Sequence, residues 1–348
     1  MDKKRKKKLL WQVPFLALLV VGTILIIRQQ RNTPYQKCSG IIFGTTYNIT
    51  YQYDRDIEAD IVARLQQVDS ALSMFNKKSV ITNVNQGDGI IPAGKTGDMF
   101  IDVFHLAMKV SDETDGAFDI TVAPLVNAWG FGFKSGDIPS RQQVDSILQF
   151  VGYHKVNYWA SRNRRGINKE DSRIMLDCSA IAKGYGVDAV ARLLDEKGIK
   201  NYLVEVGGEL VTRGVSDKRL PWKIGVTKPI DDSLHIGNEL QTVLNITDCA
   251  MATSGNYRNF YYKGGRKYAH TIDPKTGHPV QHNILSATVL SSKCAQADAY
   301  ATAFMVLGLE KAKKVLERHP ELMAYLIYDD HGENKVWFSP SLADKIAQ

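Results

Sequence analysis

The chain has 348 residues, of which 44% are hydrophobic, and a formal net charge of +7. Residues 1–31 contain eight Lys or Arg and one Asp, and removing these from the totals of 44 bases and 37 acids leaves 36 of each. A nucleic-acid-binding domain carries a basic surplus of its own, so this neutral remainder argues against a nucleic-acid partner.

The N-terminal segment has the pattern of a membrane anchor. Residues 1–10 include six Lys or Arg and are predicted to stay in the cytoplasm, because basic residues flank the cytoplasmic side of a span. Residues 11–27 are mainly apolar and about 25 Å long as a helix, which predicts a transmembrane signal anchor. Residues 28–39 are predicted to be a polar linker, and residues 40–348 the exported folded domain. No small-residue cleavage site follows Ile27; lipid attachment at Cys38 is the alternative.

The remaining elements follow from hydrophobic periodicity. Residues 41–53 alternate and predict a strand, and apolar residues at 57, 61, 65, 68 and 72 predict a helix. Further helices are expected at 98–114, 140–151 and 185–197, the last closed by Gly198. Strands are expected at 201–206, 222–227, 242–249 and 285–291, with a hairpin around 263–265, a final helix beginning near Asp298 and a strand near Leu326. This mixed order favours an α+β fold with largely antiparallel sheets.

Two glycine-containing stretches have the composition of ligand-binding loops. Residues 116–132 (GAFDITVAPLVNAWGFG) fit either a loop that stacks on a planar ligand or a structural turn with Trp129 in the core. Residues 176–190 (LDCSAIAKGYGVDAV) place Asp177 and Lys183 where a loop enters a helix. The free N–H groups of a helix N-terminus suit a phosphate, although a capped helix with a tight entry turn is equally compatible.

Two later stretches are more ambiguous. Residues 201–214 (NYLVEVGGELVTRG) predict a strand, a Gly-Gly turn and a second strand, with Glu205 and Glu209 expected as surface charges. Paired glycines also mark places where the backbone approaches a ligand closely. Residues 252–279 contain His270, which is either a structural histidine or a general base, since the usual pKa of histidine lies near neutrality.

The stretch AQADAYATAFMVLG (295–308) places a carboxylate, Asp298, in an almost wholly apolar helix. Burying an unpaired carboxylate costs several kcal/mol, so Asp298 is neutralised, bound to a cation, or simply caps the helix. Thr302 lies four residues later on the same helical face and would add a second oxygen ligand for a hard metal ion. With the phosphate and stacking loops, this pattern fits Mg²⁺-assisted chemistry on a dinucleotide diphosphate.

The sequence resembles the ApbE family, the FAD:protein FMN transferases, over essentially the whole exported domain. Seven stretches resemble family motifs in order: GTTYNITY, GAFDITVAPLVNAWGFG, DCSAIAKGYGVD, VEVGGEL, ATSGNYRNFY, HTIDPKTGHP and ADAYATAFMVLG. The resemblance implies an ApbE-like, T-fold-like α+β domain. It also implies that a Thr or Ser hydroxyl of a target flavoprotein attacks the FMN-side phosphorus of FAD, that Mg²⁺ sits on the diphosphate, and that AMP leaves.

The resemblance also implies the site residues. Asp298, the Thr302 hydroxyl and the backbone carbonyl of Ala180 fall at metal-ligand positions, and His270 falls at the position that assists proton removal. The flavin-nucleotide positions are Phe43, Phe75, Ala117, Phe118, Asp119, Asp177, Lys183 and Ile272.

The implied location is the bacterial inner membrane, with a single-pass anchor and the catalytic domain on the periplasmic side. Subunits of Rnf or Na⁺-translocating NADH:quinone reductase are the implied targets. Two other functions share this site: an FAD pyrophosphatase giving FMN and AMP, and a non-enzymatic, membrane-tethered FAD-binding protein.

Overall fold

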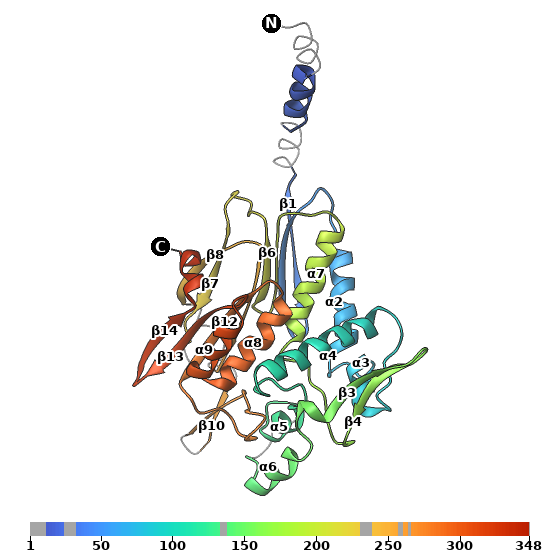
Figure 1. Ribbon diagram of the computed structural model, residues 1–348, viewed down its shortest axis with the longest axis vertical. Helices are drawn as coiled ribbons and strands as arrows, with labels where there is room; N and C mark the ends of the chain where they lie inside the picture. The colour runs from blue at the N-terminus through green and yellow to red at the C-terminus, as the bar shows by residue number, and fades with distance from the viewer. Residues whose placement is uncertain are drawn as a thin grey trace.

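The fold is built on a central antiparallel sheet. The computed structural model describes residues 12–23, 33–132, 138–229, 239–256, 260–263 and 266–347. Eight strands form the sheet in the order β1-β2-β5-β6-β9-β12-β13-β14, and every neighbouring pair runs antiparallel (Figure 1). Their bounds are β1 (Tyr35–Ile42), β2 (Thr45–Gln52), β5 (Tyr202–Val206), β6 (Glu209–Arg213), β9 (Cys249–Gly255), β12 (Ile284–Ser291), β13 (Met323–Asp330) and β14 (Glu333–Phe338).

Helices cover one face of this sheet. Helices α7 and α8 pack on strands β5, β6, β9 and β12, and α2 and α4 pack on these two helices in turn (Figure 1). The main core lies between these layers, with Phe100, Val289 and Phe304 among its fully buried members. The helices are α2 (Glu58–Leu72), α3 (Val80–Gln86), α4 (Lys95–Glu113), α5 (Ala123–Ala128), α6 (Arg141–Leu148), α7 (Ala182–Glu196), α8 (Cys294–Leu307) and α9 (Leu309–Arg318).

Hairpins complete the structure. The hairpin β7–β8 (Trp222–Thr227 and Leu240–Ile246) and the short helix η2 (Pro340–Lys345) share a hydrophobic core with the sheet through Leu210, Met251 and Leu342. Two further hairpins are β3–β4 (Val156–Ala160 and Arg165–Lys169) and β10–β11 (Phe260–Lys263 and Arg266–Ala269). A short helix η1 (Tyr153–Lys155) precedes β3.

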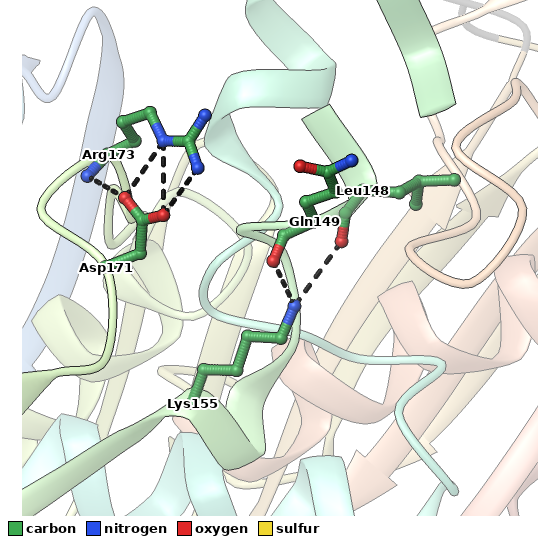
Figure 2. A network of polar contacts seen from close by, with 5 residues as sticks. All are labelled: Leu148, Gln149, Lys155, Asp171 and Arg173. Carbon is green, nitrogen blue, oxygen red and sulfur yellow. Dashed lines mark hydrogen bonds and ion pairs between the residues drawn. The ribbon is translucent and has the colours of Figure 1, made fainter. Parts of the chain in front are cut away.

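A small helical unit supports the loop after α4. Helices α5 and α6 enclose a separate core that includes Leu125, Trp129 and Ile272. The carbonyls at the end of α6 are held by Lys155, whose ammonium donates to the carbonyls of Leu148 and Gln149, while Arg173 pairs with Asp171 alongside (Figure 2). A cation at a helix C-terminus satisfies carbonyls that have no partner within the helix.

Most predicted elements are present, although their observed ends differ from the predicted ones. The expected helices correspond to α2, α4, α6 and α7, and Gly198 follows α7 with φ +77°. The α+β class and the hairpin β10–β11 are also confirmed, although Gly264 and Gly265 lie outside the described residues. Four short elements, α3, α5, β3 and β4, were not predicted, nor were helix α9, strand β14 and the short helices η1 and η2.

Three predictions of strand boundaries were wrong. The strand expected at 41–53 is two strands, because the chain turns at Phe43, which has a positive φ of 53°, and at Gly44. The strand expected at 242–249 spans the end of β8 and the first residue of β9. Strand β1 begins at Tyr35, so the last part of the expected linker 28–39 belongs to the sheet.

Only part of the predicted membrane anchor lies within the described residues. Residues 12–23 are helical, whereas residue 11 and residues 24–27 lie outside the described part of the chain. No described helix combines the length and the apolar character that crossing a membrane needs. Cys38, the alternative lipid-attachment residue, is buried within β1.

Candidate active site

A cavity of about 620 Å³ opens between the helical layer and the β7 hairpin. It brings together every sequence-predicted site residue except Phe43: Phe75, Ala117, Phe118, Asp119, Asp177, Ala180, Lys183, His270, Ile272, Asp298 and Thr302. These residues come from segments up to about 230 positions apart, so the fold and not local sequence assembles the cavity.

Phe43 lies outside this cavity. It occupies the turn between β1 and β2, and its ring lies so close to Gly186 of α7 that a methyl group there would be 2.8 Å away. Phe43 packs against the hydrophobic cores on both sides of this turn. Its expected place at the nucleotide stays a prediction, and in this structure the ring packs against the core.

The cavity has a carboxylate at its base. Asp298 is only 2% exposed, and its Oδ2 accepts a hydrogen bond of 3.0 Å from the Gly184 backbone N–H. Thr302 follows one turn later on α8, with its Oγ1 3.1 Å from the Ser254 hydroxyl. Ala180 also lines this end of the cavity, just before α7.

One interpretation of the sequence was that Asp298 caps its own helix, and the structure shows that it does not. Helix α8 begins at Cys294, four residues earlier, and Lys293 at the N-cap makes no side-chain capping bond. Instead Asp188 of α7 accepts the N–H groups of Cys294 (2.8 Å) and Ala295 (2.9 Å). Because a carboxylate from the neighbouring helix caps α8, the side chain of Asp298 is left to face the cavity.

Close packing of α7 on α8 fixes this geometry. A Cβ atom at Gly184 would lie 2.5 Å from the carbonyl oxygen of Cys294, well inside van der Waals contact. Only glycine fits at such a close approach of two backbones. The same glycine donates its N–H to Asp298, so the helix crossing and the position of the carboxylate are set together.

Glu209 is a site residue that the sequence interpretation missed. It was expected as a surface charge, but it is 3% exposed, lines the cavity, and its Oε1 lies 2.8 Å from the ammonium of Lys183. The Lys183 ammonium also lies 3.9 Å from Asp298 Oδ1. The available signal was the preceding Gly207-Gly208 pair, because paired glycines mark a close backbone approach; a methyl at Gly207 would lie 2.8 Å from Thr45 Cγ2 and 3.1 Å from Lys183 Cδ.

The charges of this group influence one another. The pKa of Glu209 is raised to about 7, chiefly by burial and also by Asp298, and Lys183 opposes this rise. Burial lowers the pKa of Lys183, but the two carboxylates outweigh this and leave it raised, so the ammonium stays charged. When Glu209 is ionised, one cation between two carboxylates leaves the group with excess negative charge, which attracts a further cation.

Asp119 organises the loop that forms one wall. Its Oδ1 accepts from the backbone N–H (2.8 Å) and the hydroxyl (2.6 Å) of Thr121, and its Oδ2 accepts from the Tyr153 N–H (2.8 Å). Burial raises the pKa of Asp119, and these hydrogen bonds oppose that shift. Ala117 and Phe118 line the cavity beside it, so Asp119 holds them in place.

The entry to α7 forms the adjoining wall. Asp177 Oδ1 accepts the Ser179 N–H at 2.7 Å, and burial raises the pKa of Asp177 despite that bond. Ser179, Ala180 and Lys183 all line the cavity at the N-terminal end of α7. This end of the helix directs its positive dipole and a lysine at the cavity, an arrangement suited to a phosphate group.

Aromatic rings also line the cavity. The ring of Phe131 lines the cavity and stacks on Tyr261 with centroids 5.2 Å apart, and His270 meets Phe131 edge-on at 6.4 Å. Trp129 is core, because it is 4% exposed and its Nε1 donates to the Gly277 carbonyl. Phe75 lines the cavity while remaining 72% exposed.

The lining of the cavity thus combines a helix N-terminus, buried carboxylates, a lysine and aromatic rings. Its oxygen donors are of mixed type, and the described residues contain no cluster of three or more His, Cys, Asp and Glu side chains placed to hold a metal. One carboxylate, one hydroxyl and one carbonyl instead match the sparse protein ligation of Mg²⁺, which commonly shares its sphere with phosphates and water.

Comparison with known proteins identifies the family of this chain. The ApbE family model matches residues 43–327. The chain is 36% identical over 287 residues to the FAD:protein FMN transferase of Escherichia coli strain K12, covering 82% of this chain and 80% of that protein. It is 33% identical over 312 residues to the FAD:protein FMN transferase of Haemophilus influenzae, covering 87% and 89%.

Solved structures show the same fold. The flavin transferase ApbE from Vibrio cholerae matches with a TM-score of 0.78 at 32% identity, covering 90% of this chain and 99% of that one. The apo form of the Pseudomonas stutzeri flavinyl transferase ApbE matches with a TM-score of 0.77 at 28% identity, covering 90% and 96%. The matched relatives are transferases, and this chain belongs to the ApbE family.

Proposed function

We propose that this chain transfers FMN from FAD to a Thr or Ser hydroxyl of a target flavoprotein and releases AMP, in a Mg²⁺-dependent reaction. The acceptor oxygen forms a bond to the FMN-side phosphorus, and the bond from that phosphorus to the bridging oxygen breaks. The bridging oxygen leaves with AMP, and the acceptor proton passes to a base. The names of the relatives support FAD as the substrate.

The observation that carries this proposal is the position of Asp298 and Thr302 at the end of the cavity next to the N-terminus of α7. Asp298 Oδ2 is engaged by Gly184, whereas Oδ1 faces Lys183 at 3.9 Å, beyond hydrogen-bond distance. Asp298, Thr302 and the carbonyl of Ala180 would hold the ion. When bound, Mg²⁺ would neutralise the diphosphate and favour loss of AMP.

Other residues of the chain would bind and orient the substrate. Lys183 and the backbone at Ser179 would bind phosphate oxygens, and Phe118 and Phe131 would contact the planar ring system. His270 lies beside Phe131 at the cavity wall and would accept the proton of the attacking hydroxyl. Positioning and charge neutralisation supply most of the catalysis in phosphoryl-type transfers.

The remaining parts of the proposal concern location and target. The basic residues before the apolar segment favour a single-pass anchor in the inner membrane with the domain on the periplasmic side. Subunits of Rnf or of Na⁺-translocating NADH:quinone reductase are proposed as acceptors.

The test is an intact-mass measurement on an acceptor domain. The full-length protein is incubated with FAD, Mg²⁺ and a threonine-bearing acceptor, in parallel with the same acceptor carrying valine at that threonine. We expect an FMN-sized mass increase on the threonine acceptor only, AMP in solution, and neither product in EDTA. Free FMN and AMP with unchanged acceptor masses would instead indicate a pyrophosphatase, and intact FAD would indicate a binding protein.

A further inference from the structure

Lys183 is held between two buried carboxylates that face the cavity. Its ammonium lies 2.8 Å from Glu209 Oε1 and 3.9 Å from Asp298 Oδ1, so only the first contact is a hydrogen-bonded ion pair. The side chains of both acids are 4% exposed. Glu209 Oε2 is buried with no hydrogen-bond partner, although it belongs to a charged group in the cavity wall.

This arrangement decides which cation neutralises Asp298. An ammonium in direct contact with a buried carboxylate would satisfy it and leave little to attract a metal ion. Lysine is a flexible point charge that can move between neighbouring acids. Glu209 is the second acid within its reach, and it holds the ammonium more than 1 Å farther from Asp298 than from itself.

The backbone around Glu209 supports this position. Gly207 has a φ of +65°, and a Cβ atom there would lie 2.8 Å from Thr45 Cγ2 and 3.1 Å from Cδ of the Lys183 stem. Because the Gly207 position is bare, the lysine stem passes over the β5–β6 turn and reaches the first residue of β6, which is Glu209.

We propose that Glu209 is a positioning residue that holds the Lys183 ammonium away from Asp298 and so keeps this carboxylate available to a divalent cation. The inference rests on the proposed function, because it takes Asp298 as a metal ligand. The inference adds that Glu209, a residue that need not touch the metal, controls how tightly the site binds a divalent cation.

The test measures binding of Mn²⁺ alone to the full-length protein, by electron paramagnetic resonance titration at pH 8 without FAD. In Glu209→Gln the neutral amide no longer balances the lysine, so the ammonium should move to Asp298. We expect Mn²⁺ to bind about 10–100-fold more weakly, the usual effect of losing an outer partner of a metal ligand. Glu196→Gln is the matched control, because it removes a carboxylate that pairs with Arg64 at the far end of α7.

The double variant Lys183→Met with Glu209→Gln separates positioning from direct ligation. If Glu209 acts through the lysine, removing both should restore Mn²⁺ binding to within about threefold of the unmodified protein. Weak binding in the double variant would overturn the proposal, because Glu209 would then itself ligate or only support the fold. Lys183→Met alone gives a further check, since it should bind Mn²⁺ at least as tightly as the unmodified protein, and weaker binding would contradict the inference.

Failure of the proposed metal site gives a different result. If Asp298→Asn binds Mn²⁺ as tightly as the unmodified protein, Asp298 is not a ligand and both proposals fall. If Asp298→Asn loses the metal but the double variant is not rescued, only the positioning role of Glu209 is refuted.

Discussion

Replacing Asp188 by Ala should destabilise the protein, because this side chain is the cap of the helix that carries Asp298. Its two oxygens accept the N–H groups of Cys294 and Ala295 at 2.8 and 2.9 Å, and both amides are buried. In Asp188→Ala the two amides lose their partner, and each orphaned buried amide costs about 1–3 kcal/mol.

Part of this loss is offset by the removal of a buried charge. Burial raises the pKa of Asp188, which shows that its charged form is unfavourable there despite the two hydrogen bonds. From a gross cost of about 2–6 kcal/mol we therefore expect a net loss of about 3 kcal/mol in the free energy of unfolding. Asp188→Asn keeps one acceptor oxygen in place and should lose about half as much.

Urea unfolding followed by circular dichroism measures this change from the transition midpoint and slope. Asp145→Ala is the control, because it removes an exposed ion pair with Arg141 at a helix surface and should change the free energy by less than about 0.5 kcal/mol. A loss below about 1 kcal/mol in Asp188→Ala would refute the capping argument, as would an Asn variant less stable than the Ala variant.

Three further predictions concern the cavity. Asp298→Asn should lower Mg²⁺-dependent AMP release at least about 100-fold, and unchanged turnover would remove Asp298 from the site. The free energy of unfolding in urea should change by less than about 1 kcal/mol, because the amide oxygen can still accept from Gly184. His270→Ala should slow single-turnover FMN transfer by about 100-fold or more with little change in the FAD dissociation constant, and the opposite pattern would make His270 a binding residue. Burial raises the pKa of Glu209 from 4.5 to about 7, so the folded protein retains a proton that the unfolded chain has released. The free energy of unfolding should therefore fall between pH 5 and 7, and Glu209 should contribute up to about 3 kcal/mol of this fall. In Glu209→Gln this contribution to the pH dependence should be absent, and equal slopes against pH in both proteins would contradict the raised pKa.

Local spacing predicted which residues of α8 share a face better than it predicted where the helix begins. Asp298 and Thr302 are one turn apart in an apolar helix, and that local spacing was enough to place both side chains on one face. The start of α8 was misplaced because its cap comes from Asp188, more than 100 residues earlier, and Lys293 gives no capping signal. A cap supplied by another helix leaves no trace in the sequence near the helix it caps.

The burial of Glu209 was hidden for a similar reason. Its partner Lys183 lies on α7, and a glutamate after a Gly-Gly turn otherwise has the pattern of a surface hairpin. The strand expected at 41–53 continued through Phe43 because an aromatic residue favours a strand, yet tertiary packing holds it in a turn with positive φ. In both places long-range packing decides what local propensity could not.

The most direct test of the site is a crystal of the full-length protein with FAD and Mn²⁺, examined for the anomalous signal of manganese. We expect a metal peak about 2 Å from Asp298 Oδ1 and from Thr302 Oγ1, with the FAD diphosphate beside it. A metal bound elsewhere, or FAD outside the cavity lined by Asp177 and Lys183, would contradict it.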